Sequence, residues 1–143
     1  MCLSMQNEAK KDKIIEYLRK KGNKITPHRL GVIDILINLK KPLSAEEIFK
    51  KLKNVNLSTV YRILEWLAGE KVAQKISLEE DFDRYELSDK FSHHHHHFIC
   101  TNCKKIKEIK CELVFKKREI ENKNKVKINS HSIELFGKCG DCR

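Results

Sequence analysis

The chain has 143 residues, of which 40% are hydrophobic and 35% charged, so we expect a folded, soluble protein of one domain or two small ones. No apolar run approaches the length of a membrane span and the N-terminus lacks the pattern of a signal peptide, so we expect a cytoplasmic protein with no membrane partner. The formal net charge of +10 fits either a lysine-rich solvated surface or a polyanionic partner, most simply DNA.

The first part of the chain has the apolar spacing of amphipathic helices. Residues 8–21 carry apolar side chains at helical spacing, and Gly22 follows as a helix stop. A second helix is predicted to have Thr26 as its N-cap and Pro27 at its first position. Its apolar residues occupy most of its faces, which predicts a place in the centre of a core.

Two further helices are predicted at short spacing. Ser44 and Glu47 have the spacing of a capping box, which marks the start of a third helix. After a short loop, Ser58 is predicted to cap a fourth helix that ends at Gly69. Two short helices joined by a tight loop and packed on a third form a helix-turn-helix arrangement.

The fourth helix is a candidate recognition helix. If its apolar stripe faces the core, the side chains left outside include Ser58, Thr59, Tyr61 and Arg62. Hydroxyl and guanidinium groups near a helix N-terminus are what such a helix presents to the major groove. The periodicity is also compatible with an ordinary surface helix.

A hairpin and a hinge are predicted next. Residues 72–77 and 84–87 have the pattern of two strands joined by an acidic turn at 78–83, and a hairpin after a helix-turn-helix is a wing. Residues 88–92 have the character of a hinge. We therefore predict a DNA-binding domain over residues 1–88 and a second domain over residues 89–143.

The second half is predicted to be a small α/β unit. Short strands are expected at 98–100 and 106–110, a helix at 112–123, and a longer strand at 126–136. The apolar core of such a unit is small. A bound metal would supply part of its folding energy, and a partner subunit would bury the rest.

Two C-x-x-C pairs lie far apart in the chain, Cys100 with Cys103 and Cys139 with Cys142. This pattern is typical of a closed structural Zn²⁺ site, in which each pair holds the metal from one tight turn. Cysteines in a chain without a signal peptide indicate metal ligands in a reducing compartment rather than disulfides. We interpret Cys2 as an incidental exposed thiol.

Five consecutive histidines directly precede the first pair. Because side chains alternate between the faces of an extended strand, His93, His95 and His97 are predicted on one face, and His94 and His96 on the other. One run can thus contribute to two metal sites. Imidazole with carboxylate suits Zn²⁺, Fe²⁺, Mn²⁺ or Ni²⁺, and the ligand types alone do not choose among them.

Together these segments resemble the ferric uptake regulator family of bacterial metal-responsive repressors. The matching pieces follow the family order and cover nearly the whole chain: Lys24-x-Thr26-x-x-Arg29, Ser44-Ala45-Glu46-Glu47-Ile48-Phe49, Leu57-Ser58-Thr59-Val60-Tyr61-Arg62-x-Leu64, Arg84-Tyr85-Glu86-Leu87, His94-His95-His96-His97-Phe98-Ile99-Cys100-x-x-Cys103, His131-Ser132-x-Glu134-Leu135 and Cys139-x-x-Cys142.

The resemblance implies an α+β fold, with an N-terminal winged helix-turn-helix followed by a small α/β dimerisation domain that carries the four-cysteine zinc site. It implies a homodimer that binds palindromic double-stranded operator DNA when loaded with metal. Lys24 and Arg29 then join the residues of the fourth helix at the DNA.

For the metal-sensing site, the resemblance implies Glu86, His95, His97 and Glu108 as ligands. The family histidine expected two positions before Ser44-Ala45 is replaced by Pro42, which cannot bind metal. Either four ligands suffice, or a nearby group such as His93 or water completes the site.

A second metal site is implied at His94, His96 and His131. The family glutamate of the following helix corresponds to Val114 here, with Glu112 nearby. Taken alone, His131 would be interpreted as a core histidine. Cys111 has no family role, and is either buried filler or a soft ligand that favours zinc.

These features favour a metal-dependent repressor of metal-uptake genes, with a structural Zn²⁺ and a second, sensed ion, either Fe²⁺ or Zn²⁺, with Mn²⁺ or Ni²⁺ also possible. A peroxide-sensing repressor of the same family is an alternative, but that branch typically has aspartate in place of Glu86 and uses the histidine replaced by Pro42. A histidine-rich metal buffer is the alternative from another class. An enzyme is least favoured, because the sequence has no H-E-x-x-H motif and a four-cysteine site is closed to substrate.

Overall fold

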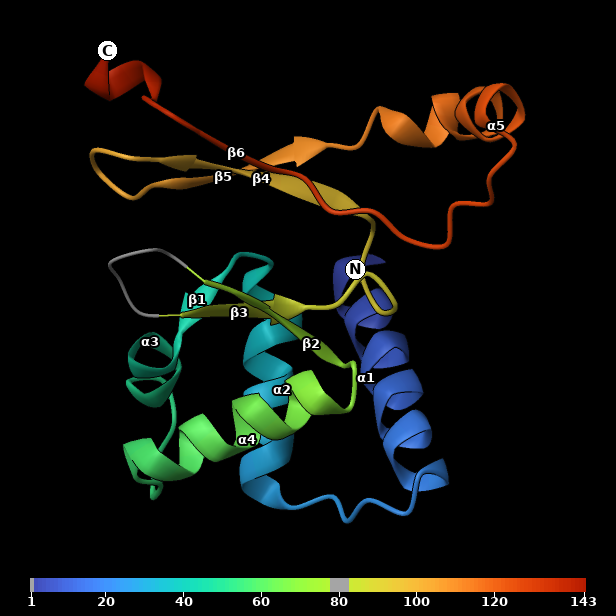
Figure 1. Ribbon diagram of the computed structural model, residues 1–143. Helices are drawn as coiled ribbons and strands as arrows, with labels where there is room; N and C mark the ends of the chain where they lie inside the picture. The colour runs from blue at the N-terminus through green and yellow to red at the C-terminus, as the bar shows by residue number, and fades with distance from the viewer. Residues whose placement is uncertain (1, 78–82) are drawn as a thin grey trace. The chain divides into compact units, whose positions relative to one another are not determined.

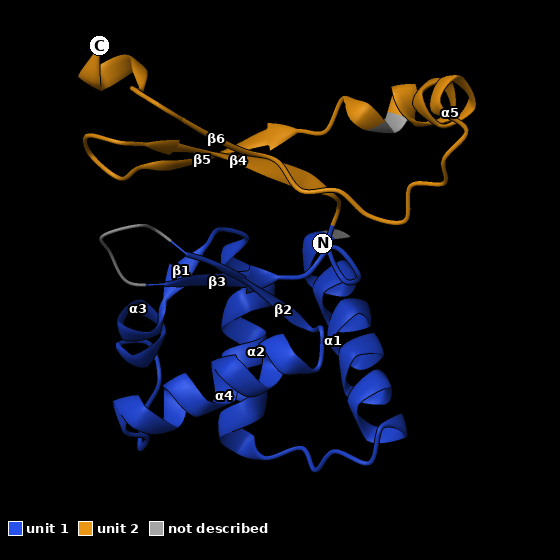
Figure 2. Cartoon of the chain, in the orientation of Figure 1, with its two compact units in different colours: residues 1–92 blue, residues 93–143 orange. Residues whose placement is uncertain are grey.

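The computed structural model describes residues 2–77 and 83–143, and the chain divides into two compact units, residues 1–92 and 93–143 (Figure 2). Compactness alone does not define independently folding domains, so the domain boundary at 88–89 stays a prediction. Within the described residues, no helix combines the length and apolar character needed to cross a membrane. The side chains of Cys2 and Val114 lie outside the described part.

Four helices form the body of the first unit (Figure 1): α1 (Cys2–Lys20), α2 (Pro27–Leu39), α3 (Ala45–Phe49) and α4 (Leu57–Gly69). The four predicted helices all form. Helix α1 begins earlier than the predicted residue 8, and the Asn7 amide there donates to Asn38 of α2 over 2.9 Å. This contact lies in the N-terminal part of α1, where the apolar periodicity did not predict a helix.

Helix ends follow the predicted capping chemistry with one correction. Thr26 Oγ1 accepts from the Arg29 backbone N–H at 3.3 Å, with Pro27 at the first helical position. Ser44 and Glu47 form both hydrogen bonds of a capping box. The prediction that Ser58 caps α4 is wrong: Asn56 is the N-cap, and its Oδ1 accepts from the Thr59 N–H at 2.8 Å. Both side chain types can cap a helix, and α4 starts two residues earlier than a cap at Ser58 would place it.

The wing is a small antiparallel sheet with strand order β1-β3-β2, where β1 is Leu43–Ser44, β2 is Ala73–Ile76 and β3 is Arg84–Leu87. The two predicted wing strands form, and most of the turn predicted at 78–83 lies outside the described residues. Strand β1 was not predicted, because two residues carry no periodicity. It places the start of α3 beside the wing.

The core of the first unit lies among α1, α2, α3, α4 and the sheet. Helix α2 contributes buried residues from several of its faces, as its continuous apolar pattern predicts. Helix α4 buries a single stripe, and Ser58, Arg62 and Glu65 on its other side are exposed. The aliphatic and aromatic side chains of this unit with no more than 1% exposure are Ile14, Leu18, Val32, Ile33, Leu43, Ala45, Ile48, Val60, Leu64, Leu67, Val72 and Tyr85.

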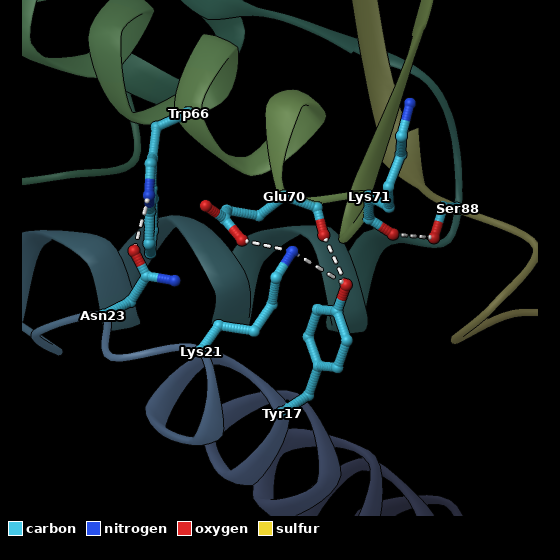
Figure 3. A network of polar contacts seen from close by, with 7 residues as sticks. All are labelled: Tyr17, Lys21, Asn23, Trp66, Glu70, Lys71 and Ser88. Carbon is cyan, nitrogen blue, oxygen red and sulfur yellow. Dashed lines mark hydrogen bonds and ion pairs between the residues drawn. The ribbon is translucent and has the colours of Figure 1, made fainter.

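A polar network fastens the end of α1 to the end of α4 (Figure 3). Lys21 forms a 2.7 Å ion pair with Glu70, and the Tyr17 hydroxyl donates to the Glu70 backbone carbonyl at 2.9 Å. Asn23 accepts from the Trp66 indole N–H at 3.2 Å. The chain leaves α1 through Gly22, whose φ of 82° suits glycine and ends the helix as predicted.

The second unit is a three-stranded sheet with one longer helix: β4 (His95–Cys100), β5 (Ile106–Lys110), α5 (Leu113–Asn124), β6 (Glu134–Gly137) and a short 3₁₀ turn, η1 (Gly140–Cys142). The strand order is β5-β4-β6, with β4 antiparallel to β5 and parallel to β6. This α+β arrangement confirms the predicted fold class.

The strand predicted over 126–136 is largely wrong, since only residues 134–137 form β6. The parallel strands β4 and β6 need a long crossover connection, and residues 126–133 are the last part of it, between α5 and β6. Lys125 turns the chain with φ 52°, and the Ile128 N–H donates back to the Glu121 carboxylate at 2.7 Å. Of the alternating segment 126–136, only residues 134–136 therefore belong to the sheet.

Candidate metal centres and nucleic-acid surface

The four cysteines of the two C-x-x-C pairs converge in the second unit. Their sulfur atoms all lie within 4.8 Å of one another, and Cys103 Sγ is 3.7 Å from Cys139 Sγ. With Zn–S bonds of about 2.3 Å, a tetrahedral site separates its sulfurs by roughly 3.8 Å. The donor set and its spacing therefore fit a structural zinc.

Backbone groups already favour negative charge at this cluster. The N–H groups of Cys103 and Cys139 point at the Cys100 sulfur and lower the pKa of that thiol to about 6. Asn102 acts in the same direction on Cys142, but the sulfurs of Cys139, Cys103 and Cys100 together raise its pKa to about 11. A bound Zn²⁺ would stabilise all four thiolates, including that of Cys142.

The two turns that carry these cysteines are also tied together by charge. Lys105, just after the first pair, forms a 2.8 Å ion pair with Asp141 of the second, and the pKa of Asp141 is lowered as a result. Both side chains are exposed, so this contact contributes little to stability. It orients the two turns toward each other.

The histidine run alternates as predicted. The ring of His95 lies 5.1 Å from that of His93 and 4.8 Å from that of His97, which places these three on one side. The rings of His94 and His96 are 4.8 Å apart and belong to the other side. A single strand therefore presents imidazoles to both of its faces.

On the first face, a carboxylate joins the histidines. Glu108 Oε1 lies 2.6 Å from His93 Nε2, and His93, His95 and Glu108 form a group whose potential ligand atoms lie within 4.8 Å of one another. Glu108 also stands opposite His97 in the β4–β5 register, so their side chains share a face. Three of the four predicted sensing residues, with His93, are thus neighbours on this sheet.

Glu86, the fourth predicted sensing residue, belongs to the first unit. It lies on β3 opposite Gln74 of β2, and its Oε1 accepts from the Gln74 side-chain amide at 2.6 Å. Its place in a sensing site remains a prediction.

On the opposite face, His94, His96 and His131 come together as predicted, and Cys111 joins them. The Nε2 atoms of His94 and His131 are 2.9 Å apart, and Cys111 Sγ lies 3.1 Å from His131 Nε2. Cys111 is half-buried beside these imidazoles, so the interpretation as filler alone misses its polar neighbours.

The candidate DNA surface lies in the first unit around the N-termini of α2 and α4. A hollow of about 220 Å³ is lined by Thr26, His28, Arg29, Thr59, Arg62 and Ile63. Three of the predicted DNA-contacting residues are among these six. Arg29 is held in place, because its guanidinium stacks 3.8 Å from the Trp66 ring centroid and donates to the Lys24 carbonyl at 2.6 Å.

Tyr61 has a structural contact that its helical position does not reveal. Its hydroxyl donates to Glu46 of α3 at 2.7 Å, and this hydrogen bond raises the pKa of Tyr61. The bond links the two helices of the helix-turn-helix. Ser58 is exposed near the start of α4, and its hydroxyl donates to Asn56 at 2.9 Å.

The sequence analysis did not single out His28, which also lines the hollow, or Glu46, the partner of Tyr61. His28 follows Pro27 in the first turn of α2. Its position between Lys24 and Arg29, two predicted DNA contacts, was the signal that could have identified it. No local signal marks Glu46, because its partner is fifteen residues away in the chain.

Comparison with known proteins gives consistent relatives. The model of the ferric uptake regulator family matches residues 20–136. The chain is 34% identical over 138 residues to the ferric uptake regulation protein of Bacillus subtilis, covering 92% of this chain and 93% of that protein.

Two solved structures agree with this likeness. The Helicobacter pylori ferric uptake regulator, described as having three functional metal-binding sites, is 30% identical with a TM-score of 0.80, covering 95% of this chain and 93% of that one. The Vibrio cholerae regulator is 32% identical with a TM-score of 0.70, covering 87% of this chain and 98% of that one.

Proposed function

The chain belongs to the ferric uptake regulator family, and from that premise we propose that it is a metal-dependent DNA-binding transcriptional repressor of metal-uptake genes. The observation that carries this proposal is the double use of strand β4. It presents histidines to both faces, each with its own non-histidine partner, Glu108 on one and Cys111 on the other. A buffer protein needs no such paired, ordered clusters beside a winged helix-turn-helix.

The proposed DNA contact uses the first turns of α2 and α4. Thr59 and Arg62 project from α4 into the hollow, and Arg29, fixed by its stacking on Trp66, adds a second guanidinium. Arginine pairs bidentately with guanine or phosphate, so these two side chains are suited to base and backbone contacts. Ser58 and Lys24 are proposed as phosphate contacts, and Tyr61 as a contact whose hydroxyl is already held by Glu46.

A homodimer is proposed through the second unit. Phe115 is 89% exposed and Phe136 53% exposed, and Ile109, Val126 and Leu135 are exposed as well. The buried hydrophobic residues described in this unit are Ile99, Cys100 and Cys139, a core too small for independent stability. A second copy would cover these apolar side chains, and zinc at the four cysteines would hold the sheet that carries them. A dimer suits palindromic operator DNA.

The proposed sensing site consists of Glu86, His95, His97 and Glu108. The 2.6 Å contact between His93 and Glu108 supports His93 as the group that completes this site in place of the histidine missing at Pro42. Imidazoles with carboxylates suit Fe²⁺ as well as Zn²⁺, and also Mn²⁺ or Ni²⁺. The reduced thiols that the four-cysteine zinc site needs are consistent with a cytoplasmic location.

In this proposal, metal acts by restricting the two parts of the chain. A ligand from the wing and ligands from β4, bound to one ion, would fix the winged helices at a spacing that matches successive half-sites. Without the ion the same surfaces remain, but the lost pre-organisation weakens DNA binding. The family is one of transcription factors, and we propose no enzymatic activity.

The test removes the one proposed ligand that comes from the wing. Glu86→Ala should retain one zinc per chain and the dimer, but lose the metal stimulation of DNA affinity, which for coupled sites is about 5- to 150-fold. Mobility shift of operator DNA, with and without added Fe²⁺ or Zn²⁺, measures the stimulation. Glu119→Ala, an exposed change of the same charge on α5, is the matched control. Full metal stimulation in Glu86→Ala would show that the connection runs through other residues.

A further inference from the structure

The thiol of Cys111 belongs to a cluster of side chains from three separate segments, which we name the thiol–histidine cluster: His94, His96, Cys111 and His131. His94 directly precedes β4 and His96 lies within it, Cys111 directly follows β5, and His131 precedes β6. The four potential ligand atoms all lie within 4.8 Å of one another. All four residues belong to the second unit.

The sheet register brings Cys111 to this position. His95 pairs with Lys110 and His96 with Ile109, so the antiparallel register, continued by one residue, places Cys111 opposite His94. Residues opposite each other share a face of the sheet, so the thiol points to the same side as His94 and His96. The convergence is therefore a property of backbone pairing and not of a chance rotamer.

The distances suit a tetrahedral ion. With Zn–N bonds of about 2.0 Å and Zn–S bonds of about 2.3 Å, ligand atoms of such a site lie roughly 3.3–3.6 Å apart. The 2.9 Å between His94 and His131 and the 3.1 Å between Cys111 and His131 need to open by only a few tenths of an ångström. The ring planes of His94 and His96 meet at 89°, so their nitrogens approach a common point from different directions.

We propose that Cys111 is a metal ligand that completes, with His94, His96 and His131, a closed site of three imidazoles and one thiolate selective for Zn²⁺ over Fe²⁺ and Mn²⁺. Thiolate is a soft donor that favours zinc, whereas the opposite face of β4 offers the hard carboxylate of Glu108. The histidines of one strand would thus bind different metals on its two faces, because a thiolate completes one site and a carboxylate the other. This deepens the proposed function, on which it rests, by naming the metal class of one of its sites.

Cobalt substitution tests the thiolate ligand directly. Co²⁺ is titrated into protein whose four-cysteine cluster holds zinc, and the near-ultraviolet absorption of thiolate-to-cobalt charge transfer is recorded. The band should develop in the wild type and in Cys2→Ser, and should be absent in Cys111→Ser, while elemental analysis shows the first zinc retained in all three. A band of unchanged intensity in Cys111→Ser, or none in the wild type, overturns the proposal.

A second measurement does not depend on a variant that folds. Alkylation of wild-type protein, followed by peptide mass analysis, gives the modification rate of each cysteine with and without added Zn²⁺. Coordination should slow modification of Cys111 at least tenfold and leave Cys2 unchanged. Equal rates at Cys111 with and without Zn²⁺ contradict its assignment as a ligand.

A parallel mobility shift separates this inference from the proposed function. A charge-transfer band without any metal-dependent DNA binding would leave the site standing and remove the regulatory function. Metal-dependent DNA binding without the band would do the opposite.

Discussion

Arg62 and Tyr61 are neighbours on the same helix, yet their surroundings differ. The Tyr61 hydroxyl is used within the unit, where it donates to Glu46 and links α3 to α4. Arg62 is exposed and lines the hollow with Thr59 and Arg29. The guanidinium of Arg62 is therefore the better candidate for reading a base edge, and the phenol of Tyr61 for fixing the helix that carries it.

Replacement of Arg62 tests this assignment. Arg62→Ala should weaken binding to operator DNA by about 1–3 kcal/mol, because a bidentate contact to a base is lost. Fluorescence anisotropy at constant salt measures the change, since phosphate contacts make affinity depend on salt. Arg19→Ala removes the same charge from an exposed position of α1 and is the control. If both variants bind operator as the wild type does, α4 does not enter the groove.

At the scale of the element, the start of α4 shows that the N-cap is the side chain whose geometry lets it accept from the first backbone N–H groups. Asn56 and Ser58 are both good capping residues. Ser58 also follows Leu57, which could form a hydrophobic staple if Ser58 were the N-cap. In the structure the Asn56 carboxamide takes the role and accepts from both the Thr59 backbone and the Ser58 hydroxyl. Ser58 lies inside the helix.

The two positions should differ in their effect on stability. Asn56→Ala removes the cap of α4 and should lower the free energy of unfolding by about 1 kcal/mol. Ser58→Ala should cost less than about 0.5 kcal/mol, as for a surface change away from a cap. Urea unfolding followed by circular dichroism measures both. A larger loss in Ser58→Ala than in Asn56→Ala would restore Ser58 as the cap.

At the scale of the whole molecule, the two units are stabilised by different means. The first has a core of mainly aliphatic side chains from four helices and a sheet. The second buries few hydrophobic residues among those described, and its exposed Phe115 and Phe136 need a cover. The proposed zinc coordination and subunit association would supply the stability that the small core of the second unit does not.

Loss of one zinc ligand should reveal this dependence. Cys103→Ser should release the structural zinc and, with it, the dimer, because the two cysteine turns hold the ends of β4 and β6 together. Elemental analysis and light scattering on the same sample measure both quantities, with Cys2→Ser as the control. A stable, zinc-free dimer of Cys103→Ser would disprove the link between the cysteine cluster and association.

Much of this protein is determined by the sequence alone. Apolar periodicity and capping residues locate the four helices of the first unit, because these signals act over one or two turns. The spacing of the cysteines predicts their convergence, and the period of two in a strand predicts the two faces of the histidine run. Each of these depends only on near neighbours in the chain.

The tertiary structure decides what depends on distant segments. The pairing of β4 with β5 brings Cys111 to the histidines. Residues 126–133 alternate like a strand but form the connection between α5 and β6. Helix α3 lies close enough to α4 for Glu46 to hold Tyr61. In each case the arrangement is set by packing or strand register, which leaves no periodic trace in the residues involved.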